Sequence, residues 1–171
     1  MNFLKLFIVL IFALITTGCM TMQTPPYEPA IDNYEQLQEG HYKKVSIGDF
    51  TVPDSKLNKI SVRGTPLKSS VNDSFGTYLK SALEEEFYKA GLLSKDSNCI
   101  ISGVLLENDI DTAVGTSSGQ ISAKVVIEDQ GKVVFSKKLT ATHQWPSSFL
   151  GAVAIPRSRD NYPFIVRKFI K

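Results

Sequence analysis

Residues 74–90 constrain the fold more than any other segment, because their apolar side chains recur at the spacing of an amphipathic helix. Asn72, Asp73 and Ser74 are candidates for capping its amino-terminal end. Gly91 is a natural stop, since glycine readily adopts the left-handed conformation found just beyond many helices. The pattern predicts a helix that buries one face against a partner layer. The apolar stripe consists of Phe75, Leu79, Ala82, Leu83, Phe87 and Ala90.

Three segments after this helix are typical of β-strands. Residues 98–106 are rich in β-branched residues and leucine, and residues 120–128 and 132–143 alternate apolar with polar side chains. The tight turn at residues 129–131 predicts that the last two strands form an antiparallel hairpin. Residues 111–119 are small, polar and glycine-bearing, so we expect a mobile hairpin tip there.

The flanking segments complete the element order. Residues 44–52 predict a strand whose alternation changes parity around Gly48, which indicates a β-bulge, and residues 60–62 predict a short second strand. Asp160 and Asn161 are expected to cap a last helix that covers the sheet. The order β(β)αβββα predicts an α+β fold, a two-layer sandwich in which a mixed β-sheet carries two helices on one face. The other face of the sheet is then open or partnered.

The N-terminus is typical of an export signal. Lys5 precedes an unbroken apolar run at residues 6–15, which small residues up to Gly18 follow. As a helix this run rises about 15 Å, roughly half of a bilayer's hydrocarbon core, so it is too short to span a membrane. We therefore interpret residues 1–18 as a cleavable signal peptide.

Gly18 and Cys19 resemble the lipobox of bacterial lipoproteins, in which the signal is cut before a cysteine that carries diacylglycerol. Two or three acyl chains hold a protein firmly, whereas a single chain binds only marginally. Met20 stands where an aspartate commonly retains lipoproteins in the inner membrane. The resemblance therefore implies a lipid-anchored protein of the cell outer membrane that faces the periplasm. The alternatives are an ordinary secretory signal and an uncleaved anchor.

The segment after Cys19 resembles a spacer. It contains three prolines among Thr, Gln and Glu and has little periodicity. Prolines favour extended backbone, so we interpret residues 19–40 as the lipidated cysteine with a flexible tether, and residues 41–171 as a single α+β periplasmic domain. The alternative is that isolated apolar side chains of this segment pack on the domain, namely Tyr27, Ile31 and Tyr34.

Charge and motifs exclude several classes of function. Nineteen Lys and Arg against seventeen Asp and Glu give a formal charge of +2, and removing residues 1–18 leaves +1. This charge is not basic enough to indicate nucleic acid as a partner. The sequence has no Gly-rich phosphate loop, no G-x-S-x-G elbow and no H-E-x-x-H motif, and its cysteines and histidines follow no zinc pattern. We therefore expect no cofactor, no metal and no enzymatic activity.

The acidic residues, the histidine and the cysteine that could carry chemistry are each interpreted as structural. Glu84, Glu85 and Glu86 diverge by about 100° each around a helix, so we interpret them as a solvated face rather than as paired catalytic acids. His143 ends a predicted strand and is interpreted as a packing residue, with a catalytic base as the alternative. Cys99 is expected to be a buried small hydrophobe, with a redox or disulfide role as the alternative.

The most unusual stretch is residues 145–157, which is apolar but has neither strand nor helix periodicity. One interpretation is a loop that packs over an end of the sheet. The other is a surface for a protein partner or for lipid, because exposed apolar patches mark interaction sites. The candidate contact residues are Trp145, Phe149, Leu150, Val153, Ile155 and Arg157.

Several stretches resemble a group of small, uncharacterised bacterial envelope lipoproteins: the lipobox and residues 60–64, 78–91, 101–105 and 147–156. The architecture is also similar to the lipopolysaccharide-assembly lipoproteins, the ABC-transport auxiliary lipoproteins and the N-terminal domain of the Tol–Pal translocation protein. Because a fold does not establish a task, no catalytic residue is carried over.

These resemblances imply a lipid-anchored, non-enzymatic accessory or docking component of an outer-membrane assembly or transport system. Its expected partners are the membrane, through the N-terminal anchor, and an envelope protein. The alternatives are a hydrolase acting on envelope glycan or lipid and a purely structural lipoprotein.

Overall fold

The computed structural model describes residues 21–171, which form two β-sheets and three α-helices. The main sheet has the order β2-β5-β6-β7, with bounds Ser46–Thr51, Cys99–Asp111, Gly115–Asp129 and Lys132–Ser147. A smaller sheet has the order β1-β4-β3, with bounds Met22–Gln23, Thr65–Lys68 and Ile60–Val62. The helices are α2 (Ile31–Glu39), α3 (Phe75–Lys89) and α4 (Gly151–Ile170), and a short 3-10 helix, η1, covers Ser55–Asn58. The predicted signal peptide and the predicted lipidation site at Cys19 lie outside the described residues.

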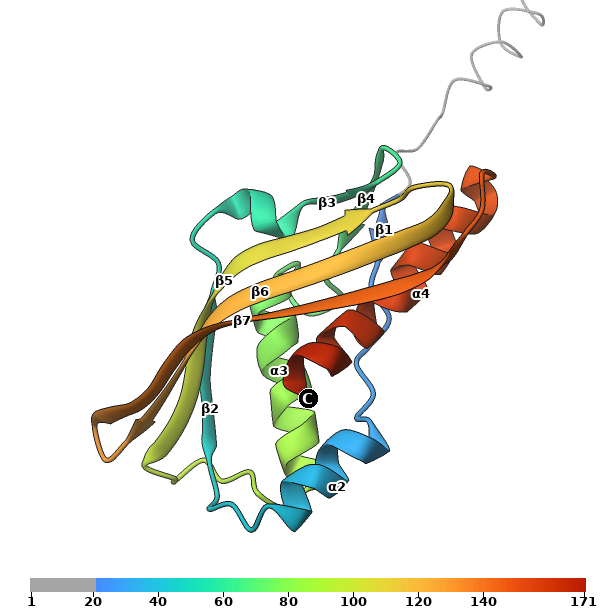
Figure 1. The fold of residues 1–171 in the computed structure, drawn as a ribbon. Coiled ribbons are helices and arrows are strands. Elements are labelled where there is room, and N and C mark those ends of the chain that lie inside the picture. Colours follow the sequence, from blue (N-terminus) through green and yellow to red (C-terminus); the bar gives the residue numbers. More distant parts are fainter. Residues whose placement is uncertain (1–20) are drawn as a thin grey trace, which may run out of the picture.

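The α+β fold is confirmed, with α3 and α4 on one face of a mixed main sheet (Figure 1). β2 pairs with β5 in parallel across the connection that contains α3, whereas β5, β6 and β7 pair antiparallel. The structure adds strand β4, the small sheet and helix α2 to the predicted elements. In the described part of the chain, no helix covers the opposite face of the main sheet (Figure 1).

Helix α3 forms as its local sequence predicts. The Ser74 hydroxyl accepts a hydrogen bond from the Thr77 backbone N–H at 3.3 Å, and Gly91 ends the helix with φ +74°. Gly76 packs so closely on β2 that a Cβ added there would lie 2.1 Å from the Phe50 carbonyl oxygen. The apolar stripe of α3 therefore forms the core against the sheet, as predicted.

The predicted turns and the bulge are largely confirmed. The β2–β5 register shifts between Ile47 and Phe50, on either side of Gly48. Gln130 and Gly131 both have positive φ, as a tight two-residue hairpin turn requires. The hairpin tip predicted at residues 111–119 is present but shorter, because β5 runs to Asp111 and β6 already begins at Gly115. β7 runs beside β6 as far as Ser147, so the polar residues 115–119 of β6 pair with the backbone of β7.

The predicted flexible tether is wrong for residues 21–40. β1 pairs with β4, and Met22 and Thr24 are buried. Tyr27 packs on the core as the alternative proposed, although Ile31 is 59% exposed. The segment folds back because α3 offers it a buried hydrogen-bond acceptor, which is described below.

The last helix begins earlier than predicted. α4 starts at Gly151, so Asp160 and Asn161 lie inside it rather than at its cap. Pro156 and Pro163 lie within the helix, although proline lacks the backbone N–H that a helix interior uses. Packing of α4 on β6 and β7 outweighs this loss. None of the helices in residues 21–171 combines the length and apolar character needed to cross a bilayer.

Candidate functional site

Four large apolar side chains are exposed at one end of the main sheet. Val114, in the turn between β5 and β6, is 72% exposed. Phe149, Leu150 and Val153, where β7 passes into α4, are 74%, 51% and 39% exposed. The pairing of Gly115 with Ser147 brings the two segments side by side. We call these four residues the apolar tip.

Arg63 holds the apolar tip in place from the turn between β3 and β4. Its guanidinium donates hydrogen bonds to the carbonyls of Phe149 at 2.9 Å, Ser148 at 2.7 Å and Thr112 at 3.5 Å. Hydrogen bonds from a charged donor are stronger than neutral ones. The exposed side chains are therefore carried on backbone that is fixed to a third segment of the chain.

The described chain begins at the same end of the domain. β1 runs parallel to β4 with Met22 opposite Leu67, and β4 leads directly away from the turn that contains Arg63. Figure 1 shows β1, the β3–β4 turn, the β5–β6 turn and the start of α4 gathered at this end. Thr21 and the apolar tip therefore lie on one side of the molecule.

The structure divides the predicted contact residues into two groups. Trp145 is 4% exposed and belongs to the core, so its prediction as a surface contact is wrong. Ile155 is partly buried against the same core. Arg157 is exposed and donates to the Pro146 carbonyl at 3.0 Å. Of the predicted lipidation and cleavage residues, Cys19 and Gly18, nothing is described.

His143 is a packing residue, as predicted. Its ring lies 5.7 Å, between centroids, from those of Trp145 and Phe164, and its Nε2 is 3.1 Å from Asn161 Oδ1. Burial lowers the pKa of His143 because the imidazolium loses solvation, although the contact with Asn161 opposes this. Cys99 is buried at the start of β5, also as predicted.

The prediction that Glu86 belongs to a solvated helix face is wrong. Its side chain is fully buried on α3, whereas a solvated face was expected. One carboxylate oxygen accepts hydrogen bonds from the Tyr27 hydroxyl, the Ala30 backbone N–H at 2.9 Å and the Asn33 amide at 3.1 Å. Burial, and then Glu86 itself, raise the pKa of the Tyr27 phenol. The signal was present in the sequence, since Glu86 follows Ala82 by four residues and so continues the apolar stripe.

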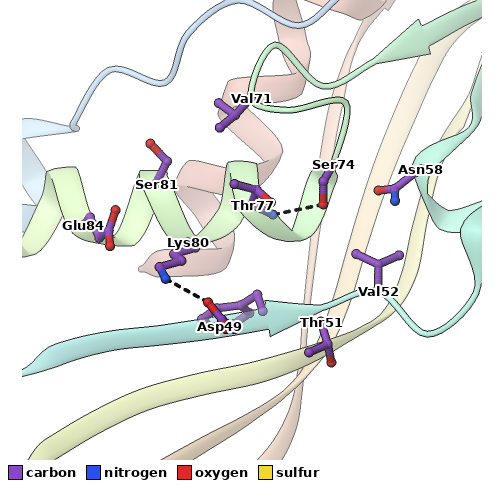
Figure 2. A pocket seen from close by; sticks show the side chains of 11 residues that line it. Asp49, Thr51, Val52, Asn58, Val71, Ser74, Thr77, Lys80, Ser81 and Glu84 are labelled. Atoms are coloured by element: carbon purple, nitrogen blue, oxygen red, sulfur yellow. Dashed lines mark hydrogen bonds and ion pairs between the residues drawn. The ribbon is translucent and has the colours of Figure 1, made fainter.

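A cavity of about 610 Å³ lies between β2 and α3. Figure 2 shows Lys80 reaching from α3 to Asp49 on β2, where Nζ and Oδ1 are 2.8 Å apart. This hydrogen bond lowers the pKa of Asp49 and keeps it ionised. Because Asp49 is paired with Lys80, the two side chains are better suited to joining β2 to α3 than to transferring a proton.

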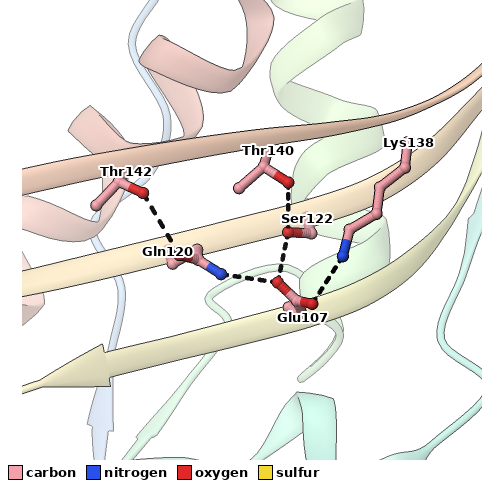
Figure 3. Close-up of polar contacts among 6 residues, drawn as sticks. All are labelled: Glu107, Gln120, Ser122, Lys138, Thr140 and Thr142. Carbon is pink, nitrogen blue, oxygen red and sulfur yellow. Dashed lines mark hydrogen bonds and ion pairs between the residues drawn. The ribbon is translucent and has the colours of Figure 1, made fainter.

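A polar network occupies the sheet face that carries no helix (Figure 3). Glu107 accepts from Ser122 at 2.6 Å, from Gln120 at 2.7 Å and from Lys138 at 2.8 Å. Lys138 and then the two neutral donors lower the pKa of Glu107 to about 2. Thr140 extends the network through Ser122 at 2.8 Å. The face thus presents an ordered polar network in which the charge of Glu107 is paired with that of Lys138.

Residues 21–171 hold no group of three or more His, Cys, Asp or Glu side chains that could bind a metal ion.

Comparison with known proteins shows a shared fold. No family model and no curated protein matches the chain. The crystal structure of a protein from Xanthomonas campestris, with the family model DUF330, is similar with a TM-score of 0.53 and 13% identity, over 88% of this chain and 87% of that chain. The crystal structure of a minor lipoprotein from Acinetobacter baumannii aligns with a TM-score of 0.43 and 17% identity, over 75% of this chain and 87% of that one. At 13% identity, the first likeness establishes the fold alone.

Proposed function

We propose that this protein is a lipid-anchored envelope lipoprotein, a non-enzymatic accessory or docking component of an outer-membrane assembly or transport system. In this proposal Cys19 carries the lipid, and the domain formed by residues 21–171 presents surfaces to the bilayer and to an envelope protein. The lipobox-like Gly18–Cys19 pair is the sequence basis for the anchor.

The observation that carries the proposal is the packing of residues 22–24, which follow Cys19 closely in the sequence. Met22 is 5% exposed and pairs with Leu67, and Thr24 is buried and hydrogen-bonded to Ser70. Because this segment is part of the fold, an anchor at Cys19 holds the domain close to the membrane, without a long flexible linker between them. Such a domain is positioned to support a membrane-bound assembly.

The open face of the main sheet supports the docking part of the proposal. Hydroxyl and amide side chains dominate its central rows, and the Glu107 network orders them. A protein partner meets polar groups that are already in place, so little side-chain ordering is needed on binding. We assign this face to the envelope protein partner.

The anchor is tested by growing cells with an alkyne-tagged palmitate and separating their membranes. We expect the wild-type chain to be labelled and to sediment with the outer membrane, and the Cys19→Ser variant to lose both properties. Cys99→Ser is the matched control, because this buried thiol is not the proposed lipid site. Labelling that persists in Cys19→Ser would contradict the anchor.

The docking face is tested with a photo-cross-linking residue placed at Thr142, on the open face of β7. The control is the same residue at Glu85, which is exposed on α3. We expect one reproducible envelope protein to be captured from Thr142 and not from Glu85. Equal capture from both positions would refute the assignment of this face.

A further inference from the structure

We infer that the apolar tip (Val114, Phe149, Leu150 and Val153) enters the lipid of the leaflet that anchors the protein. The inference rests on the proposed anchoring at Cys19 and adds a second membrane contact, which sets how the domain is oriented. The occupant of this exposed apolar surface is thus a phospholipid leaflet.

The position of the anchor is the first argument. Two peptide steps separate Cys19 from Thr21, and each spans at most about 3.8 Å between Cα atoms, so the lipid is attached within about 8 Å of Thr21. Continuing the β1–β4 register by one residue places Thr21 level with Pro66, close to the turn that holds Arg63. Arg63 in turn binds the backbone of the apolar tip. A lipid on Cys19 therefore brings the bilayer surface to the apolar tip.

The chemistry of the two tip segments is the second argument. Residues 112–123 contain no charged side chain, and residues 144–156 contain none either. Entry of these segments into lipid leaves no charged side chain of theirs to desolvate, and burying charge is what makes membrane entry expensive. Arg157 follows at the edge of the apolar tip, where its exposed guanidinium suits a phosphate headgroup.

The fold itself gives no reason for these side chains to be apolar. Leu150 occupies the N-cap of α4 and makes no side-chain cap, although Ser, Thr, Asp or Asn there would stabilise the helix. Phe149 leaves about three quarters of its surface in water, with 74% exposed. Burial of such surface in lipid is favourable in proportion to the apolar area removed from water.

The test uses the full-length chain extracted from membranes and reconstituted into vesicles of phosphatidylethanolamine and phosphatidylglycerol. Ala152→Cys, exposed beside the apolar tip, carries an environment-sensitive dye. Gln130→Cys, in the β6–β7 turn at the far end of the sheet, is the matched control. We expect brominated lipid to quench the dye at position 152 and to leave the dye at position 130 bright.

A second pair of variants removes the apolar surface. Phe149→Ser combined with Leu150→Ser is expected to abolish most of the quenching at position 152, whereas Val134→Ser, which removes an exposed valine from β7, is not. Because all three side chains are exposed, we expect unchanged circular dichroism spectra, which reports that the variants fold.

Each outcome decides the inference. A chain that floats with the vesicles but is unquenched at position 152 overturns the inference and leaves the anchor standing. A chain that does not float refutes the anchor and the apolar tip together. A dye response at position 152 that grows with protein concentration and needs no vesicles identifies a second copy of the chain as the occupant, which also overturns the inference.

Discussion

Replacing Glu86 by leucine is expected to release residues 21–40 from α3 and to destabilise the domain. One Glu86 oxygen accepts hydrogen bonds from Tyr27, Ala30 and Asn33, all of them in the N-terminal segment. Leucine keeps a similar volume but removes the acceptor. Three donors that are satisfied in the folded protein then lose their partner.

The size of the effect follows from these three bonds. A buried donor left without an acceptor costs about 1–3 kcal/mol. The lower end applies, because Asn33 retains its bond to the Arg167 carbonyl and the segment can move its other donors into water. Removal of a buried carboxylate offsets part of the loss. We therefore expect the free energy of unfolding to fall by about 2–3 kcal/mol, which lowers Tm by roughly 5–10 °C for a domain of this size.

The measurement is chemical denaturation combined with amide hydrogen exchange. Exchange is expected to accelerate first at residues 27–33, before the sheet is affected, because the segment is lost locally. Glu85→Leu is the control, since this neighbour is exposed and its replacement is expected to change stability by less than about 0.5 kcal/mol. If Glu86→Leu costs no more than Glu85→Leu, the buried carboxylate does not hold the segment.

Two further predictions concern packing and pH. Gly76→Ala places a Cβ 2.1 Å from the Phe50 carbonyl oxygen, so we expect a loss of about 2 kcal/mol or more by denaturation, whereas Gly151→Ala meets no close contact and is expected to be neutral or stabilising. The pKa of His143 is lower in the folded protein than its ordinary value of 6.5. As the pH falls below 6.5, the unfolded chain therefore binds a proton at His143 more readily than the folded protein does, and the free energy of unfolding decreases. His143→Asn is expected to flatten the stability profile in that range, and a slope identical to that of the wild type would contradict this.

The elements that sequence predicted well depend on local interactions. Ser74 and Gly91 bound α3 because a cap and a left-handed stop act within one helical turn. Gln130 and Gly131 make their hairpin turn for a similarly local reason. A pattern of neighbouring residues is enough to predict such features.

The predictions that failed concern contacts between distant segments. Glu86 looked like a member of an acidic run, and its burial depends on donors that lie more than fifty residues earlier in the chain. Helix α4 starts at Gly151, nine residues before the predicted cap at Asp160, because its packing on the sheet favours helix across residues 151–157, which have no helical periodicity of their own. Trp145, predicted to lie in a loop, belongs instead to the edge strand β7, where it pairs with Ser117 and buries its side chain in the core.

Sequence alone determined the α+β class, the order of the main-sheet strands with α3 and α4, the main turns and the expectation of a lipid anchor at Cys19. Periodicity, turn residues and a short apolar leader are all local patterns. Tertiary structure alone decided that residues 21–40 belong to the domain and that Val114 and Phe149 lie together near Thr21. The physical reason is that strand register and the hydrogen bonds of Arg63 join segments that are far apart in the chain, and no local pattern records which distant backbone they will meet.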